Sequence, residues 1–233
     1  MADVFSEEDI AWLISIGIKR SDLDVTIKYY PSFTKVLLEN KKVLEQAAKA
    51  VKPDDRHFIF SDIFALPNLD SFIRSGAELA VVCTHLIKIY DAIGLTYLQS
   101  LMTTLLSKGM IKSISDLEKV SNIAQATGKN AINVLGKGLL AFDDILKTLS
   151  DVETACSALQ AIANASGKQA DSVFNLMLPT ARKYIRSVND ILPVGYAVVE
   201  AWKQNIKDRN LDAFIRDYLA KKPTTPEAKR KAA

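Results

Sequence analysis

Two stretches of the sequence, Ala126-Thr127-Gly128-Lys129-Asn130-Ala131 and Ala165-Ser166-Gly167-Lys168-Gln169-Ala170, repeat one pattern 39 residues apart. The match extends without a gap over residues 123–152 and 162–191, where nine of thirty aligned positions are identical. In both stretches a glycine and a lysine separate two segments whose apolar residues recur at helical spacing, which is typical of two helices joined by a glycine turn. A repeat of this length falls in the range of stacked helical hairpins. We therefore expect a duplicated helical hairpin.

The second helix of each expected hairpin carries an apolar stripe at steps of three and four residues, the pattern of one face of an antiparallel bundle. Pro179 removes a backbone donor inside the second copy and should kink that helix. Ser115-Asp116 and Ser150-Asp151 precede the two turns and are expected to cap the first helices. The stripe comprises Ala131, Leu135, Gly138, Phe142, Ile145 and Leu149 in the first copy, and Ala170, Phe174, Met177, Ala181, Tyr184 and Val188 in the second.

The two copies carry opposite charges beside this shared stripe. Asp143 and Asp144 of the first copy align with Arg182 and Lys183 of the second, and Arg186 follows about one turn later. One interpretation is two separate solvated faces. The other is that the patches meet, either within the chain or between subunits joined head to tail. These five residues form the candidate interaction site.

The rest of the chain also favours helices, because the 233 residues include only nine glycines and seven prolines, and few breakers accompany long runs of good helix formers. We predict an all-α, multi-helix bundle that contains the duplicated hairpin. We expect one helical domain and a flexible basic tail. The domain spans residues 1–220, with N-terminal helices at 1–66, an apolar central hairpin at 68–108, the duplicated hairpins at 115–191 and C-terminal helices at 194–220, and the tail spans 221–233.

Several local patterns give specific expectations in the N-terminal half. Pro31 should interrupt a helix, which resumes over residues 33–51. Residues 58–64, Phe-Ile-Phe-Ser-Asp-Ile-Phe, alternate as a strand would, but the flanking caps favour a short buried helix. Gly94 should bend the apolar segment or mark a close helix contact, and Lys108-Gly109 should end it.

Charge and cysteine content bear on compartment and class. The whole chain has a net charge of +3, and residues 221–233 alone carry +4, so the net charge of residues 1–220 is −1. A folded region that binds nucleic acid is usually more basic than this. The acidic N-terminus does not resemble a signal peptide. Cys83 and Cys156 lie in apolar stretches typical of buried thiols rather than of a disulfide. We expect a protein that is cytoplasmic or released without a Sec signal peptide.

No pattern in the sequence indicates catalysis, a metal site or a cofactor. His57 and His85 lie at no helical spacing to a plausible set of ligands, and Cys83 lies too close in sequence to His85 to share a helix face with it. Gly128-Lys129 lacks the earlier glycine and the following hydroxyl of a phosphate loop. We expect no catalytic residues, no cofactor and no metal.

We therefore expect a non-enzymatic helical interaction or assembly protein that self-associates or binds a protein partner. One alternative is a membrane-active, pore-forming or membrane-inserting protein that uses the apolar segment 72–106. Another is a nucleocapsid-like protein that packages nucleic acid through the basic tail. The membrane candidates are Leu95, Leu98, Leu101, Met102, Leu105 and Leu106, and the tail candidates are Lys221, Lys222, Lys229, Arg230 and Lys231.

Overall fold

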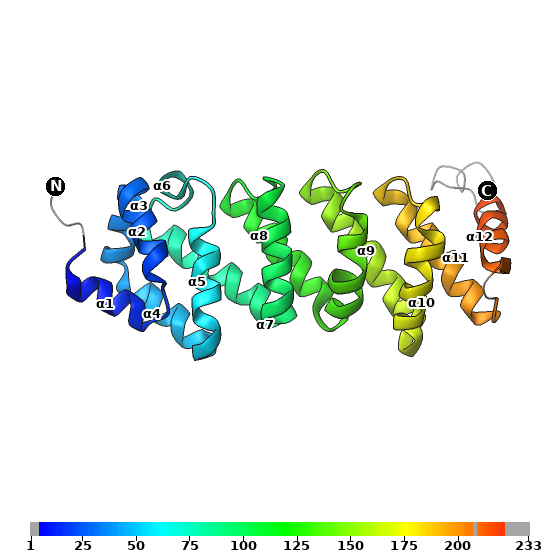
Figure 1. Cartoon of the computed structure of the whole chain (residues 1–233), viewed down its shortest axis with the longest axis horizontal. Coiled ribbons are helices and arrows are strands. Elements are labelled where there is room, and N and C mark those ends of the chain that lie inside the picture. The colour runs from blue at the N-terminus through cyan, green and yellow to red at the C-terminus, as the bar shows by residue number, and fades with distance from the viewer. Residues whose placement is uncertain (1–4, 207–208, 222–233) are drawn as a thin grey trace. The chain divides into compact units, whose positions relative to one another are not determined.

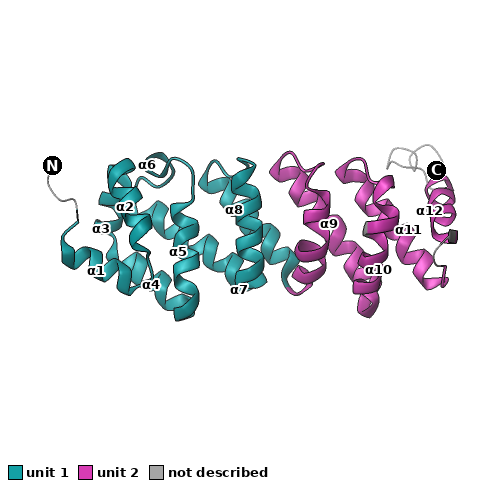
Figure 2. Ribbon diagram, in the orientation of Figure 1, with its two compact units in different colours: residues 1–128 teal, residues 129–233 magenta. Residues whose placement is uncertain are grey.

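The computed structural model describes residues 5–206 and 209–221. Every regular element in this part of the chain is a helix, and none is a strand (Figure 1). The all-α, multi-helix fold predicted from the sequence is therefore confirmed. The chain divides into two compact units, residues 1–128 and residues 129–233 (Figure 2), where the sequence was interpreted as one domain over residues 1–220.

The first unit consists of short helices followed by two long ones. Its buried residues, among them Phe33 and Phe60, form the core that these helices share. Helix α7 packs against α4, α5 and α8. The elements are α1 (Glu7–Ser15), α2 (Arg20–Tyr29), α3 (Pro31–Glu39), α4 (Lys41–Ala50), η1 (Pro53–Asp55), α5 (Arg56–Phe64), α6 (Leu69–Phe72), α7 (Gly76–Ser107) and α8 (Ile114–Thr127).

The prediction of one continuous helix over residues 33–51 is wrong, because this stretch forms two helices, α3 and α4. The helix before Pro31 ends at Tyr29, as expected, and Pro31 is the first residue of α3, because a proline at this position lacks only a donor that has no intrahelical partner. The break comes at Asn40, whose backbone has φ −122° and ψ 37°. Its side-chain Nδ2 donates to the Val36 carbonyl at 2.8 Å, and such local bonds compete with continued helix.

The other local predictions for this unit are confirmed. Residues 58–64 lie in α5, which buries Ile59, Phe60 and Ile63. Gly94 interrupts α7 with φ 77° and ψ 167°, a conformation outside the helical region. The helix ends at Ser107, Lys108 is its C-cap residue, and Gly109 follows with φ 63°.

The second unit begins directly after the first glycine turn. Helix α11 packs against α9 and α12, and α9 also packs against η3 and α10. The elements are η2 (Gly128–Asn130, which spans the division), η3 (Ile132–Gly138), η4 (Leu139–Phe142), α9 (Leu149–Ser166), η5 (Gly167–Gln169), α10 (Ala170–Leu176), η6 (Met177–Ala181), η7 (Arg182–Tyr184), η8 (Val188–Asp190), α11 (Ile191–Lys203) and α12 (Arg209–Lys221).

The two glycines of the repeated stretch have nearly the same backbone conformation. Gly128 has φ 44° and ψ −123°, and Gly167 has φ 54° and ψ −126°. Each ends an α-helix and begins a 3₁₀ turn. A π-helical segment then follows at once in the first copy, as η3, but only after α10 in the second, where η6 contains Pro179. The backbone thus matches at the turns, while duplication of the whole hairpin stays a prediction.

The predicted apolar stripes lie mostly in the core. Ile145 of the first copy and Tyr184 and Val188 of the second are half-buried, and the other nine members are buried. The predicted caps are displaced by two residues. Ser113 and Thr148, rather than Ser115 and Ser150, cap α8 and α9, because their hydroxyls accept hydrogen bonds from the backbone N–H groups of Asp116 and Asp151.

Candidate functional site

One capping motif occurs four times in the described residues. It consists of an aliphatic residue, a basic residue, a serine or threonine, any two residues, an acid and a second aliphatic residue. Two copies lie in the first unit and two in the second. The copies are Ile73-Arg74-Ser75-Gly76-Ala77-Glu78-Leu79, Ile111-Lys112-Ser113-Ile114-Ser115-Asp116-Leu117, Leu146-Lys147-Thr148-Leu149-Ser150-Asp151-Val152 and Ile185-Arg186-Ser187-Val188-Asn189-Asp190-Ile191.

The motif makes the same contacts each time. The acid accepts a hydrogen bond from the backbone N–H of the basic residue, at 2.6 Å for Glu78 and at 3.0 Å for Asp116, Asp151 and Asp190. Both aliphatic positions are at most 2% exposed in every copy. The motif therefore fixes the start of a helix and anchors it to the core on both sides.

A turn follows each of these capped helices. It lies at Gly94, Gly128, Gly167 and Asn205, all of which have positive φ. A second helical segment then leads to the next motif, or to the end of α12. We refer to residues 75–112, 113–147, 148–186 and 187–221, of which 207–208 lie outside the described part, as the four capped hairpins, a name for their order of cap, helix, turn and second helical segment along the chain.

A small residue lies eight positions after each capping serine or threonine. These residues are Cys83, Ser121, Cys156 and Gly195, and all are buried. At Gly195 the reason is visible, because a Cβ atom there would collide with Cδ1 and Cγ1 of Ile162. A small residue thus lets α11 approach α9 closely.

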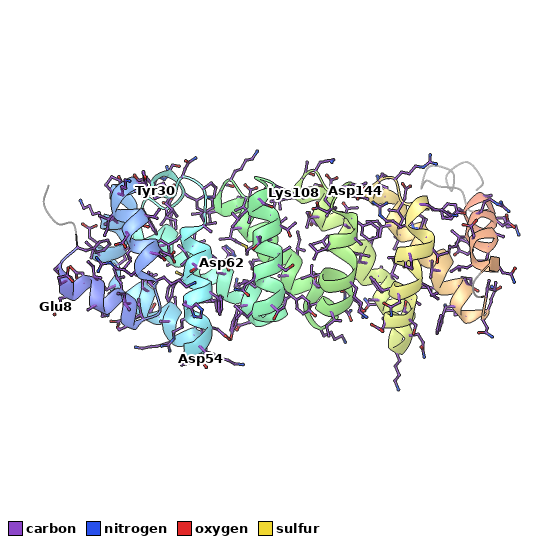
Figure 3. The ribbon with its side chains drawn as sticks, in the orientation of Figure 1. Glu8, Tyr30, Asp54, Asp62, Lys108 and Asp144 are labelled. Carbon is purple, nitrogen blue, oxygen red and sulfur yellow. The ribbon has the colours of Figure 1, made fainter. Side chains whose placement is uncertain are left out.

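The structure brings two of the predicted interaction residues together within the second unit. The Arg182 guanidinium lies 2.5 Å from Oδ1 of Asp144 and also donates to the carbonyls of Ala141 and Ile185. The guanidinium carbon lies 5.3 Å from the centre of the Phe142 ring. The hydrogen bond from Arg182 lowers the pKa of the Asp144 carboxyl. Figure 3 shows Asp144 in the loop between η4 and α9.

Lys183 makes a different contact. Its Nζ lies 2.5 Å from Oδ1 of Asp212 on α12, and the Tyr184 hydroxyl donates to the same carboxylate at 2.8 Å. Lys137 and Asp171 form a further ion pair between segments of the second and third capped hairpins. Asp143 is exposed, and so is Arg186, whose N–H belongs to the capping motif. The opposed charges therefore join neighbouring segments of one chain.

A shallow hollow of about 450 Å³ lies between the second and third turns of α9 and the start of η8–α11 in the second unit. Apolar atoms of Ala158, Val188 and Leu192 line part of it. The polar lining comes from Thr154, Ser157 and Asn189, with the carboxylate of Glu153 beside them. The hollow combines apolar surface with several polar groups, and the sequence patterns did not indicate it.

The membrane candidates lie on the second part of α7. Leu98, Leu101, Met102 and Leu105 are buried within the first unit, while Leu95 and Leu106 are half-buried. By length and apolar content α7 is long enough to cross a membrane. Its helical backbone is nevertheless broken at Gly94. Of the tail candidates, Lys221 is the last residue of α12, and Lys222, Lys229, Arg230 and Lys231 lie outside the described residues.

Other titratable groups lie buried or half-buried away from these ion pairs. Cys83 and Cys156 are free thiols whose pKa burial raises to about 12. Burial lowers the pKa of His85. Asp62 on α5 has an enclosed Oδ2 without a hydrogen-bond partner, and burial raises the pKa of this carboxyl to about 7. No group of three or more His, Cys, Asp or Glu side chains in the described part of the chain is arranged to hold a metal.

Comparison with known proteins gives no relative: no family model, no curated protein and no solved structure matches the chain.

Proposed function

We propose that the chain is a non-enzymatic helical-repeat scaffold that binds a protein partner. The observation that carries this proposal is the fourfold occurrence of the capping motif, with the same hydrogen bond and the same two buried aliphatic residues in every copy. Tandem helical hairpins bury their apolar faces against their neighbours and leave extended outer surfaces for partners.

The interior supports a scaffold rather than a reaction centre. The buried small residues of the capped hairpins serve close helix packing, as Gly195 does beside Ile162. The ion pairs Asp144–Arg182 and Lys183–Asp212 link neighbouring segments of the chain. These groups are used in holding the hairpins together, which leaves the outer helix faces as the surface for recognition.

Site-specific photo-crosslinking tests the proposal directly. A photoreactive amino acid such as benzoylphenylalanine replaces Ser157, at the hollow, or Ser32, exposed on α3 of the first unit, in the full chain expressed in its own cells. We expect Ser157, Ser32 or both to crosslink a defined protein in stoichiometric yield. If the folded protein forms no protein adduct at Ser157 and none at Ser32, the scaffold proposal is contradicted.

Light scattering after size exclusion separates this proposal from its alternatives. We expect the mass of the purified chain to be unchanged by neutral or anionic vesicles, and no dye to leave those vesicles. Vesicle binding with dye release would favour the membrane-active alternative. Salt-sensitive binding to RNA that is lost on truncation after Ala220 would favour the nucleic-acid alternative.

A further inference from the structure

We propose that the hollow between α9 and η8–α11 binds an extended peptide that places a lysine or arginine beside Glu153 and a small aliphatic side chain against Leu192. This inference rests on the proposed scaffold function and names the chemistry of the partner. One wall of the hollow comes from the third capped hairpin and the other from the fourth, near the start of each. Its volume of about 450 Å³ accommodates a few side chains rather than a folded domain.

The hydroxyl groups of the hollow are available for a ligand. Serine and threonine inside helices commonly bond back to the carbonyl four residues earlier. Six side chains in the described part of the chain do so, namely Thr26, Thr34, Thr84, Thr104, Thr127 and Ser166. Among the described residues, Thr154 and Ser157 form no such bond and no other side-chain hydrogen bond. Both line the hollow.

Asn189 adds an amide to these hydroxyls. It occupies one of the two variable positions of its capping motif, so the cap does not use its side chain. Within the described chain that side chain also has no hydrogen-bond partner. An amide and two hydroxyls offer both donors and acceptors, which is what the main-chain N–H and C=O groups of an extended peptide require.

Glu153 sets the charge of the ligand. It is the one ionisable side chain that lines the hollow, it is exposed, and it has no ion-pair partner among the described residues. A cation on the peptide would complement this carboxylate, whereas a phosphate or an anionic lipid headgroup would be repelled. Ala158, Val188 and Leu192 supply apolar surface for a neighbouring side chain of moderate size.

A peptide-display experiment tests this assignment. The probes are three seven-residue libraries that hold arginine, alanine or glutamate fixed at the central position, selected against the full chain. We expect enrichment from the arginine library only, with small aliphatic residues next to the arginine. The best peptide is then synthesised with a fluorophore and its dissociation constant is measured by polarisation.

Matched variants place that binding in the hollow. Glu153→Lys should weaken it about tenfold or more, and Ser157→Tyr, which fills the hollow from an exposed position, should abolish it. Glu118→Lys is the control, because Glu118 follows Ser113 by five residues as Glu153 follows Thr148, and both are exposed. The Glu118→Lys variant should bind the peptide as tightly as the unmodified chain does. Far-ultraviolet circular dichroism confirms that each variant is folded.

The contrary outcomes are distinct. Equal enrichment of the three libraries, or a peptide whose affinity is unchanged by Ser157→Tyr, overturns the hollow as the binding site. The scaffold proposal survives that result if photo-crosslinking at Ser32 still yields a defined partner. Loss of all protein adducts overturns both proposals.

Discussion

The side chain of Ile162 on α9 occupies the space that a Cβ atom would need on Gly195 of α11. Both residues are buried, and the helices pack side by side in the second unit. A glycine inside a helix costs about 1 kcal/mol relative to alanine. Its presence here reflects the close approach of the two helices, which a methyl group would prevent.

Gly195→Ala should therefore destabilise the protein although alanine favours helix. We expect the free energy of unfolding to fall by up to about 2 kcal/mol, because overpacking costs roughly 1–3 kcal/mol and the gain in helix propensity is only about 1 kcal/mol. Urea denaturation followed by circular dichroism measures the change. In an Ile162→Ala background, which removes the colliding atoms, the same substitution should be neutral or stabilising. Destabilisation of equal size in both backgrounds would show that Ile162 is not the cause.

The capping motif gives a second prediction, for Thr148. Thr148→Ala removes the hydroxyl that accepts from the Asp151 N–H at 3.2 Å and should lower the free energy of unfolding by about 1 kcal/mol. Ser150→Ala is the matched control, because Ser150 is exposed two residues further on and plays no part in the cap. We expect almost no change for that variant. Equal losses in the two variants would assign the effect to the region rather than to the cap.

The displaced caps show what the sequence could and could not specify. In Thr148-Leu149-Ser150-Asp151 two hydroxyls precede one acid, and both satisfy the composition of a helix start. Only the backbone decides between them: Thr148 has φ −136° and ψ 163°, outside the helix, whereas Ser150 lies within α9. The sequence pattern correctly placed Asp116 and Asp151 at the helix starts, but it assigned the capping hydroxyl to the wrong serine in each case.

The glycine turns were predictable because glycine is the one residue that adopts positive φ without strain. The other capped hairpins were missed for a physical reason. The two copies found without a gap have the same distance from turn to next cap, Gly128 to Thr148 and Gly167 to Ser187. The distance from Gly94 to Ser113 is one residue shorter, and the last turn has asparagine in place of glycine. An alignment without gaps loses register in those other copies. The hollow depends on how α9 and α11 pack, which no local pattern contains.

The opposite charges at aligned positions of the two copies correctly indicated one ion pair, Asp144 with Arg182. Asp144 and Arg182 are joined within the second unit, one of the two arrangements that the pattern allowed. Lys183 pairs instead with Asp212, which lies in α12 and outside the repeated stretch. Opposite signs at aligned positions predict attraction, but the partner of each side chain depends on how neighbouring segments are offset.

Because the Asp144–Arg182 pair lies within one chain, breaking it should affect stability rather than assembly. Arg182→Glu should lower the melting temperature and leave the molecular mass measured by light scattering unchanged. Asp144→Arg combined with Arg182→Asp restores opposite charges and should recover part of the loss. The recovery should diminish in high salt, since screening weakens an exposed pair. A fall in molecular mass with Arg182→Glu would indicate instead that Arg182 acts between subunits.

Asp62 makes the stability of the protein depend on pH. Its enclosed Oδ2 has no hydrogen-bond partner, and burial raises the pKa of the folded carboxyl from 3.8 to about 7. The folded state thus retains the proton that the unfolded chain loses near pH 4. The stabilisation is complete below that pH, declines as the pH rises and is lost once the pH passes about 7.

Asp62→Asn should remove this dependence, because the amide cannot ionise. We expect the excess of the variant over the unmodified protein in free energy of unfolding to be about 1–3 kcal/mol larger at pH 8 than at pH 5. Urea denaturation at the two pH values measures this. His85, whose pKa is lowered by burial, also contributes a pH dependence, but it is present in both proteins and cancels in the difference. A difference that is the same at pH 5 and pH 8 would show that Asp62 does not titrate between them.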